Sequence, residues 1–281
     1  MTIVEAIAFG SDSLIKAALA EPMREANSLL QFSIARDRAF IIAHPEYVLT
    51  SGEEELFRGA IVRRSAREPF QHIVGRQEFY GLDFFVSPDV LIPRPETELI
   101  VERAIELLID LPSPRFLEIG VGSGCISVTI LKHCAKASSL ACDVSGSAIE
   151  MAYRNAAMHG VVELLTIIDS DVFDNVPNEK FDLIVSNPPY VPLAEYAYLE
   201  PEVRDHDPRI AVTDGSSGLS IIERIAHGSP TFLTSGGHLL IEIGHGQRDA
   251  VREMFATDLW RSVAFVPDLQ GIPRMLDAQL A

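Results

Sequence analysis

The sequence predicts an α/β fold, in which a mostly parallel, seven-stranded sheet follows a small N-terminal helical domain and a β-hairpin linker. From residue 115 onward, five short apolar runs alternate with helical patterns, and two more strand-like runs occur in residues 262–280. Short apolar strands that alternate with helices are typical of a parallel sheet covered by helices on both faces. Residues 1–70, in contrast, show helical patterns only.

The N-terminal region is predicted to be helical because its apolar residues recur at steps of three and four. In residues 21–37 this spacing gives a helix one apolar face, formed by Met23, Ala26, Leu29, Leu30 and Ile34. Pro22 suits the first turn of that helix. Residues 51–66 predict another helix, with Ser51 as its N-cap, acidic residues in the first turn and two arginines in the last.

A change of composition at Phe70 marks the linker. Residues 70–88 hold two runs of aromatic and β-branched residues, separated by Gly-Leu-Asp, and this pattern predicts a β-hairpin. Pro93 and Pro95 then favour extended backbone, and a helix is expected to start near Thr97. We therefore divide the chain into a helical domain (residues 1–70), a hairpin linker (residues 71–92) and a sheet domain (residues 93–281).

The composition indicates a globular, cytoplasmic protein. Of 281 residues, 47% are hydrophobic and 22% charged. No apolar run reaches the roughly 18 residues of a membrane span, and the N-terminus lacks the basic cluster of a signal peptide. The three cysteines are too few and too close together for a disulfide framework, so we expect reduced, buried thiols. No Cys/His spacing indicates a metal site.

The charge balance narrows the choice of partners. A formal net charge of −17 favours solubility and disfavours docking on a phosphate backbone. We therefore expect no direct contact with nucleic acid and a basic protein as the partner. We also expect a monomer that does not contact a membrane.

A glycine-rich loop follows the first strand of the predicted sheet. The sequence FLEIGVGSGCISVTIL, residues 116–131, places Gly120, Gly122 and Gly124 between a strand and a helix. The spacing G-x-G-x-G differs from the G-x-G-x-x-G of dinucleotide sites. With Glu118 just before it, the loop resembles the first motif of class I S-adenosylmethionine-dependent methyltransferases. The resemblance implies that Glu118 and residues 120–124, with Val121 and Ser123 among them, contact S-adenosylmethionine.

Acidic residues also follow the next two strands. Asp143 ends the second strand, where a carboxylate can accept both hydroxyl groups of a ribose. NAD has the same ribose, so Asp143 does not distinguish the two cofactors, and it can equally cap the helix that follows. Asp171 and Val172 come after the third strand. In this fold they flank the adenine, with Asp171 accepting from its amino group, although a plain surface turn explains them as well.

The fourth strand ends in the sequence IVSNPPYVP, and this stretch predicts the reaction. Ligands of open α/β sheets bind beyond the carboxyl ends of the strands, so Asn187, Pro188, Pro189 and Tyr190 should lie beside the methyl donor. The motif resembles one of methyltransferases that act on planar nitrogens: adenine, guanine or the glutamine side chain. Such a nitrogen is a poor nucleophile and must be positioned.

Each residue type in this motif suits that task. The Asn187 amide oxygen and the Pro188 carbonyl can each accept one N–H of the planar group, and the prolines stiffen the geometry. Tyr190 can stack on the planar group. We therefore predict that Asn187, Pro188 and Tyr190 are catalytic, that Asn187 also lies beside the cofactor, and that all four residues bind the substrate.

The flanking segments narrow the substrate. LIPRPETELIVERAI (residues 91–105), residues 202–225 and GGHLLIEIGHGQ (residues 236–247), together with the glycine loop and N-P-P-Y, resemble the PrmC/HemK family over nearly the whole chain. The resemblance implies methylation of the glutamine side-chain nitrogen (N5) in the GGQ motif of class I peptide chain release factors, with S-adenosylhomocysteine as the second product. Arg94, Glu96 and Glu98 then border the active site, where Arg94 and Glu96 are expected to support substrate binding. The same segment can equally be a capped helix start, with Thr97 or Glu96 at the cap.

Three other functions stay open at this point. A related enzyme methylates a glutamine of a large-subunit ribosomal protein, and the sequence separates the two poorly. Methylation of adenine or guanine in nucleic acid would need a basic groove or a recognition domain, which the net charge of −17 disfavours. A cofactor-binding scaffold without activity is the third. If the protein methylates release factors, we expect residues 1–70 to dock the body of the release factor.

Overall fold

The computed structural model describes all residues, 1–281, and the chain forms two compact units. Unit 1 comprises Met1–Arg76 and Glu200–His206, and unit 2 comprises Gln77–Leu199 and Asp207–Ala281. The backbone therefore passes from one unit to the other three times. A segment from the second half of the chain thus folds with the N-terminal helices, which was not predicted from the sequence.

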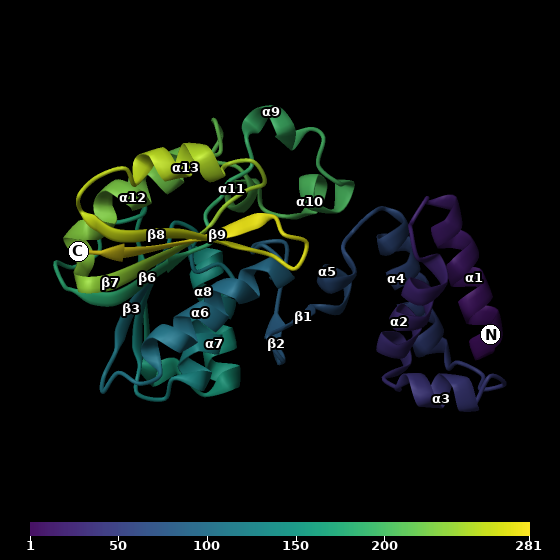
Figure 1. The fold of residues 1–281 in the computed structure, drawn as a ribbon. Helices are drawn as coiled ribbons and strands as arrows, with labels where there is room; N and C mark the ends of the chain where they lie inside the picture. Colours follow the sequence, from purple (N-terminus) through teal and green to yellow (C-terminus); the bar gives the residue numbers. More distant parts are fainter. The chain divides into compact units, whose positions relative to one another are not determined.

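Unit 1 is a bundle of helices with a hydrophobic core of its own (Figure 1). Its helices are α1 (Ile3–Lys16), α2 (Pro22–Ile34), α3 (Arg38–Ala43), α4 (Ser51–Ser65), α5 (Phe70–Val74) and α10 (Pro201–His206). Helix α2 starts at Pro22, as predicted. Helix α1 approaches its neighbours closely at Gly10, where an added Cβ would lie 2.9 Å from the Phe57 ring and 3.0 Å from Ala26.

The N-cap predicted for α4 was wrong by one residue. Thr50, rather than Ser51, is the N-cap: its hydroxyl accepts from the Glu53 backbone N–H, and the Glu53 carboxylate accepts from the Thr50 N–H. This reciprocal pair is a capping box, which satisfies two backbone donors at once and so favours Thr50 over Ser51.

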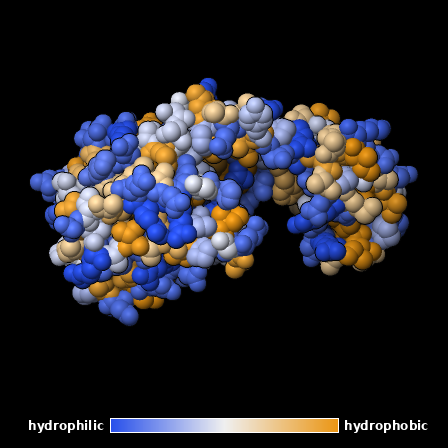
Figure 2. All heavy atoms as spheres, turned by 45° about the horizontal axis from the view of Figure 1, so that its top comes forward, coloured by the Kyte–Doolittle hydropathy of each residue, from blue (hydrophilic) through white to orange (hydrophobic).

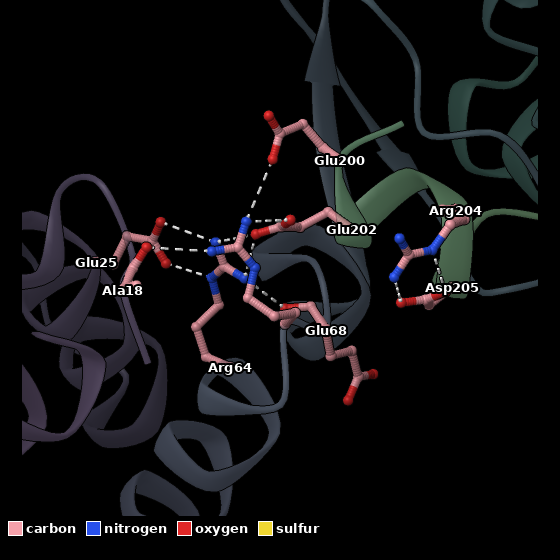
Figure 3. A network of polar contacts seen from close by, with 9 residues as sticks. Ala18, Glu25, Arg64, Glu68, Glu200, Glu202, Arg204 and Asp205 are labelled. Atoms are coloured by element: carbon pink, nitrogen blue, oxygen red, sulfur yellow. Dashed lines mark hydrogen bonds and ion pairs between the residues drawn. The ribbon is translucent and has the colours of Figure 1, made fainter. Parts of the chain in front are cut away.

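A cluster of charged side chains holds α10 on the bundle (Figure 3). The Arg64 guanidinium is buried between two carboxylates, pairing with Glu25 and, at 3.0 Å, with Glu202 of α10. Arg67 donates to the other oxygen of Glu202 at 2.7 Å. Because buried charges are stable only when they are paired and hydrogen-bonded, this cluster explains why residues 200–206 belong to unit 1.

Unit 2 is built on the predicted seven-stranded sheet. The strand order is β5-β4-β3-β6-β7-β9-β8, in which β9 pairs antiparallel with both β7 and β8 and all other pairs are parallel. The strands are β3 (Arg115–Ile119), β4 (Ser138–Asp143), β5 (Leu165–Asp169), β6 (Phe181–Ser186), β7 (Leu233–Glu242), β8 (Trp260–Pro267) and β9 (Pro273–Leu280). The C-terminal ends of β3, β4, β5, β6 and β7 therefore lie along one edge of the sheet.

Helices cover both faces of this sheet (Figure 1). One core lies between the sheet and α6 (Glu98–Leu108), α7 (Cys125–His133) and α8 (Gly146–His159). The other lies under α12 (Ser220–Phe232) and α13 (Arg248–Met254). The short elements η1 (Pro95–Thr97), η2 (Val162–Leu164), α9 (Leu193–Tyr196) and α11 (Arg209–Val212) complete the unit.

All three cysteines are buried and unpaired, as expected for reduced thiols. None of the helices combines the length and the apolar character needed to cross a lipid bilayer.

The hairpin prediction was right in part. Strands β1 (Arg76–Phe79) and β2 (Leu82–Phe85) pair around a Tyr80-Gly81 turn, in which both residues have positive φ, and Leu82 and Asp83 belong to the second strand rather than to the break. Residues 70–74, which were predicted as strand, form α5 instead. Gly75, in the left-handed conformation, ends that helix.

Candidate active site

The candidate site is a cavity of about 390 Å³ at the C-terminal ends of the parallel strands of unit 2. Residues after β3, β4, β5 and β6 line it, joined by the segment before α6 and by parts of residues 208–224. The lining includes the following residues singled out from the sequence: Arg94, Glu118, Gly120, Val121, Gly122, Ser123, Asp143, Asp171, Val172, Asn187 and Pro189.

The glycine loop has the conformation for which glycine is needed. Gly120, Gly122 and Gly124 all have positive φ, and the Gly120 and Val121 N–H groups both donate to the Cys142 carbonyl, at 2.9 and 3.0 Å. Gly124 does not line the cavity. A Cβ there would lie 3.1 Å from Ala152 of α8, so this glycine permits the close approach of α7 and α8.

Asp143 ties the glycine loop to the end of β4. One carboxylate oxygen accepts from the Gly122 N–H at 2.9 Å, and the other accepts from the Ser145 N–H at 3.0 Å. Ser145 is the N-cap of α8, so Asp143 does not have the capping role that the sequence left open. Each oxygen of Asp143 keeps a second lone pair, with which it can accept a hydroxyl group.

Glu118 is a buried carboxyl group at the end of β3. It is 1% exposed, and it accepts hydrogen bonds from the Ser127 backbone N–H, at 3.0 Å, and from the Ser127 hydroxyl. Burial raises the pKa of Glu118 to about 8, although the two bonds from Ser127 act in the opposite direction. Glu118 thus joins β3 to α7 beneath the cavity.

This raised pKa makes stability depend on pH. Between its ordinary pKa of 4.5 and about 8, Glu118 binds a proton in the folded state but not in the unfolded state. The free energy of unfolding should therefore fall as pH rises through that window, by up to about 1.4 kcal/mol per pH unit for this group. Glu118→Gln should remove this contribution, as measured by denaturant unfolding at several pH values. An unchanged pH slope in the variant would contradict the assignment.

Asp171 and Val172 line the cavity on the β5 side. The Asp171 carboxylate pairs with Arg224 of α12 at 2.8 Å, which fixes its orientation. Val172 is buried with a φ of +54°, a conformation that β-branched residues rarely adopt. Its carbonyl accepts from the Ser170 hydroxyl and the Cys142 thiol. The adenine contacts predicted for Asp171 and Val172 stay a prediction.

The N-P-P-Y segment follows β6 directly, but only part of it faces the cavity. Asn187 and Pro189 line the cavity, whereas Pro188 and Tyr190 do not. The Tyr190 hydroxyl donates to Glu242 at 3.1 Å, and burial together with this carboxylate raises the pKa of Tyr190 well above its usual range. The stacking role of Tyr190 stays a prediction.

The R-P-E-T-E segment, residues 94–98, is anchored at several points. Arg94 lines the cavity and pairs with the buried Asp207 at 2.6 Å. Glu98 accepts from the Tyr80 N–H at 2.8 Å. Glu96 is exposed and lies outside the cavity lining, so its predicted substrate contact stays a prediction. Thr97 occupies the N-cap position of α6, as the helix-start alternative has it, but neither its side chain nor that of Glu96 makes a capping hydrogen bond.

Three residues of the site were missed by the sequence analysis. Thr97 and Glu242 are buried and hydrogen-bonded to each other at 2.6 Å, and Thr97 also contacts Asn187. Gln247 donates to the carbonyls of Tyr190 and Gly218, at 2.8 and 3.2 Å, so it holds the backbone of the N-P-P-Y segment. Glu242 could have been found, because it is an acid within the otherwise apolar run LLIEIG.

The fold, the glycine loop and the N-P-P-Y segment after β6 define a class I methyltransferase. The family model described as "Methyltransferase small domain" matches residues 97–198, and the "PrmC N-terminal domain" matches residues 5–75. The crystal structure of a methyltransferase from Pyrococcus furiosus has the same fold: its TM-score is 0.54 at 17% identity, covering 79% of this chain and 96% of that one.

Curated relatives specify the family. The release factor glutamine methyltransferase of Koribacter versatilis is 41% identical over 278 residues, which are 98% of each chain. That of Geobacter sulfurreducens is 40% identical over 256 residues, covering 91% of this chain and 89% of the relative. The chain belongs to the release factor glutamine methyltransferase family.

Proposed function

We propose that this chain transfers a methyl group from S-adenosylmethionine to the side-chain nitrogen of the glutamine in the GGQ motif of class I peptide chain release factors. It acts as a cytoplasmic monomer and contacts no nucleic acid directly. The observation that carries the proposal is the position of Asn187: it lines the cavity at the end of β6, and no donor of the protein bonds its side-chain oxygen.

The cavity fits the proposed cofactor. Its volume of about 390 Å³ lies within the range of small-molecule sites. Asp143 has lone pairs available for the ribose hydroxyls, and the glycine loop leaves its backbone open to the methionine end. Asp171 and Val172 line the same cavity, where they are proposed to contact the adenine. When bound, S-adenosylmethionine supplies an activated methyl group on a sulfonium.

The substrate amide needs two acceptors. Its NH2 group carries two protons, and its lone pair is delocalised into the carbonyl. Asn187 Oδ1 and the Pro188 carbonyl both lack a donor within the protein, so each can accept one N–H and hold the nitrogen in place. Two such acceptors direct the lone pair toward the methyl carbon, and positioning of this kind is a large part of catalysis.

The transfer balances without any further reactant. The nitrogen forms a bond to the methyl carbon as the carbon–sulfur bond breaks, and sulfur takes up that electron pair. S-adenosylhomocysteine results, and the nitrogen then loses one proton to solvent. The chain itself positions the amide and need not deprotonate it beforehand.

Unit 1 is proposed to dock the release factor. Hydrophobic side chains reach its surface in several patches (Figure 2). Three of them, Ile15, Met23 and Ile42, are more than half exposed and line one groove along α1, α2 and α3. Exposed apolar groups that gather in a groove are typical of protein-binding sites. Unit 1 holds no part of the cavity at the strand ends.

Replacing Ile15, Met23 and Ile42 together with serine should raise the KM for the whole release factor at least about tenfold, because the lost apolar contacts amount to more than about 1.4 kcal/mol. Methylation of a short glutamine peptide should not change. Val62→Ser, an equally exposed position outside the groove, serves as the control. Equal losses with the peptide and the whole factor would contradict docking at this groove.

The proposed function is tested by the destination of the methyl group. The chain is incubated with S-adenosylmethionine labelled in its methyl group and with a mixture of release factor, ribosomal proteins, DNA and RNA, which are then separated. Label on the release factor supports the proposal. Label on a ribosomal protein or on nucleic acid would overturn it in favour of the other acceptor.

A further inference from the structure

A short chain of hydrogen bonds starts at Asn187 and leads through Thr97, which lines the cavity as well. Asn187 Nδ2 donates to Thr97 Oγ1 at 3.0 Å, and Thr97 Oγ1 donates to Glu242 Oε2 at 2.6 Å. Glu242 Oε1 accepts from the Tyr190 hydroxyl at 3.1 Å. Thr97 and Glu242 are 2% and 1% exposed, so water does not compete for these bonds.

The donors that are available fix the direction of these hydrogen bonds. An ionised carboxylate can only accept, so the single hydroxyl proton of Thr97 is committed to Glu242. Toward Asn187, Thr97 then offers lone pairs alone. The NH2 group of the Asn187 amide must therefore face Thr97, which leaves the amide oxygen pointing away from Thr97 and available to another donor.

This orientation decides whether Asn187 can bind the substrate. An amide turned by 180° would present its own NH2 group to the NH2 group of the glutamine, two donors facing each other. We propose that Thr97 and Glu242 are positioning residues, which hold Asn187 with its oxygen toward the substrate nitrogen. This inference rests on the proposed methylation of an amide NH2 group and adds the device that orients its acceptor.

The test compares two changes at Thr97 with the full-length chain and a release factor. Thr97→Val has nearly the same shape but lacks the hydroxyl group, so Asn187 loses its acceptor. We expect kcat to fall at least about tenfold, because the hydrogen bond that orients the Asn187 amide is lost. Thr97→Ser keeps the hydroxyl and should stay within about threefold of the original rate.

Two readouts separate positioning from a general structural effect. For Thr97→Val, the KM for the release factor and the Kd for S-adenosylhomocysteine should stay within about twofold of the values for the unmodified chain. Both depend less than kcat does on the orientation of the Asn187 amide. A full kcat in Thr97→Val, or an equal loss in Thr97→Ser, would overturn the proposal. If the unmodified chain methylates no release factor at all, it is the proposed function that fails.

If Thr97→Val does not fold, Glu242→Gln tests the proposal instead. Burial raises the pKa of Glu242 to about 7, with Glu96 raising it further and Thr97, Tyr190 and Arg274 lowering it. Protonated Glu242 can donate a hydrogen bond to Thr97. The Thr97 hydroxyl is then free to donate to Asn187, and the orientation of the Asn187 amide is no longer fixed. In the unmodified chain, we expect kcat to decrease as the pH drops below about 7. In Glu242→Gln, this decrease should be absent. The same decrease in both would overturn the proposal.

Discussion

Replacing Asn187 with alanine should lower kcat for release factor methylation by at least about 10²-fold, the loss typical when one preorganised hydrogen-bonding group is removed from an active site. The reason is that Asn187 lines the cavity directly after β6 and that its Oδ1 is proposed to accept from the substrate amide. The alanine variant leaves the substrate amide with the Pro188 carbonyl alone. The rate is measured with a release factor at saturating concentrations of both substrates.

Binding of the cofactor provides the control for this variant. The groups proposed to hold the cofactor come from the glycine loop, Asp143, Asp171 and Val172, and Asn187 supplies only a neighbouring contact. The Kd for S-adenosylhomocysteine, measured by calorimetry, should therefore change by less than about threefold, a loss of well under 1 kcal/mol. Retained turnover in Asn187→Ala would contradict the role given to its amide oxygen.

Replacing Gly218 with alanine should reduce kcat about 10²-fold, because it displaces the N-P-P-Y backbone. A Cβ at Gly218 would lie 2.2 Å from the Tyr190 carbonyl oxygen and 2.9 Å from its carbonyl carbon. These are backbone atoms that cannot turn aside. Gln247 holds the same two segments together by bonding the carbonyls of Tyr190 and Gly218, so the strain would pass to the residues that bind the substrate.

Gly215 offers a matched control in the same loop. Its φ of +75° is close to the +77° of Gly218, but an added Cβ there meets no atom within 4 Å. Both alanine variants should lose roughly 1–2 kcal/mol of stability from the left-handed backbone. Only Gly218→Ala should lose activity in addition. Equal kcat values in the two variants would show that the contact with Tyr190 does not matter for catalysis.

Much of the fold could be predicted from the sequence because its signals are local. The alternation of strands and helices, the glycine loop and the end of β6 at Asn187 each depend on a few neighbouring residues. Residues 70–74 were misassigned because a short apolar run fits a strand and a buried helix equally well. The helix is decided by its ends, at Pro69 and Gly75, and not by the run itself.

The remainder of the site depends on contacts between residues far apart in the chain. Thr97 seemed a helix cap from its neighbours, yet its hydroxyl is bonded to Glu242, which is 145 residues away. Nothing near Glu202 in the sequence indicates that it pairs with Arg64, 138 residues earlier, and so joins α10 to unit 1. Only the tertiary structure brings such partners together, and sequence periodicity carries no signal for them.

The central claim is that Asn187 and the strand ends around it serve the methylation of a glutamine side chain in a release factor. Its most direct test is tandem mass spectrometry of a release factor after incubation with the chain and S-adenosylmethionine. We expect one methyl group on the glutamine side chain of the GGQ motif, and none when Asn187→Ala replaces the unmodified chain. A methyl group on any other residue, or an unmethylated release factor, would contradict it.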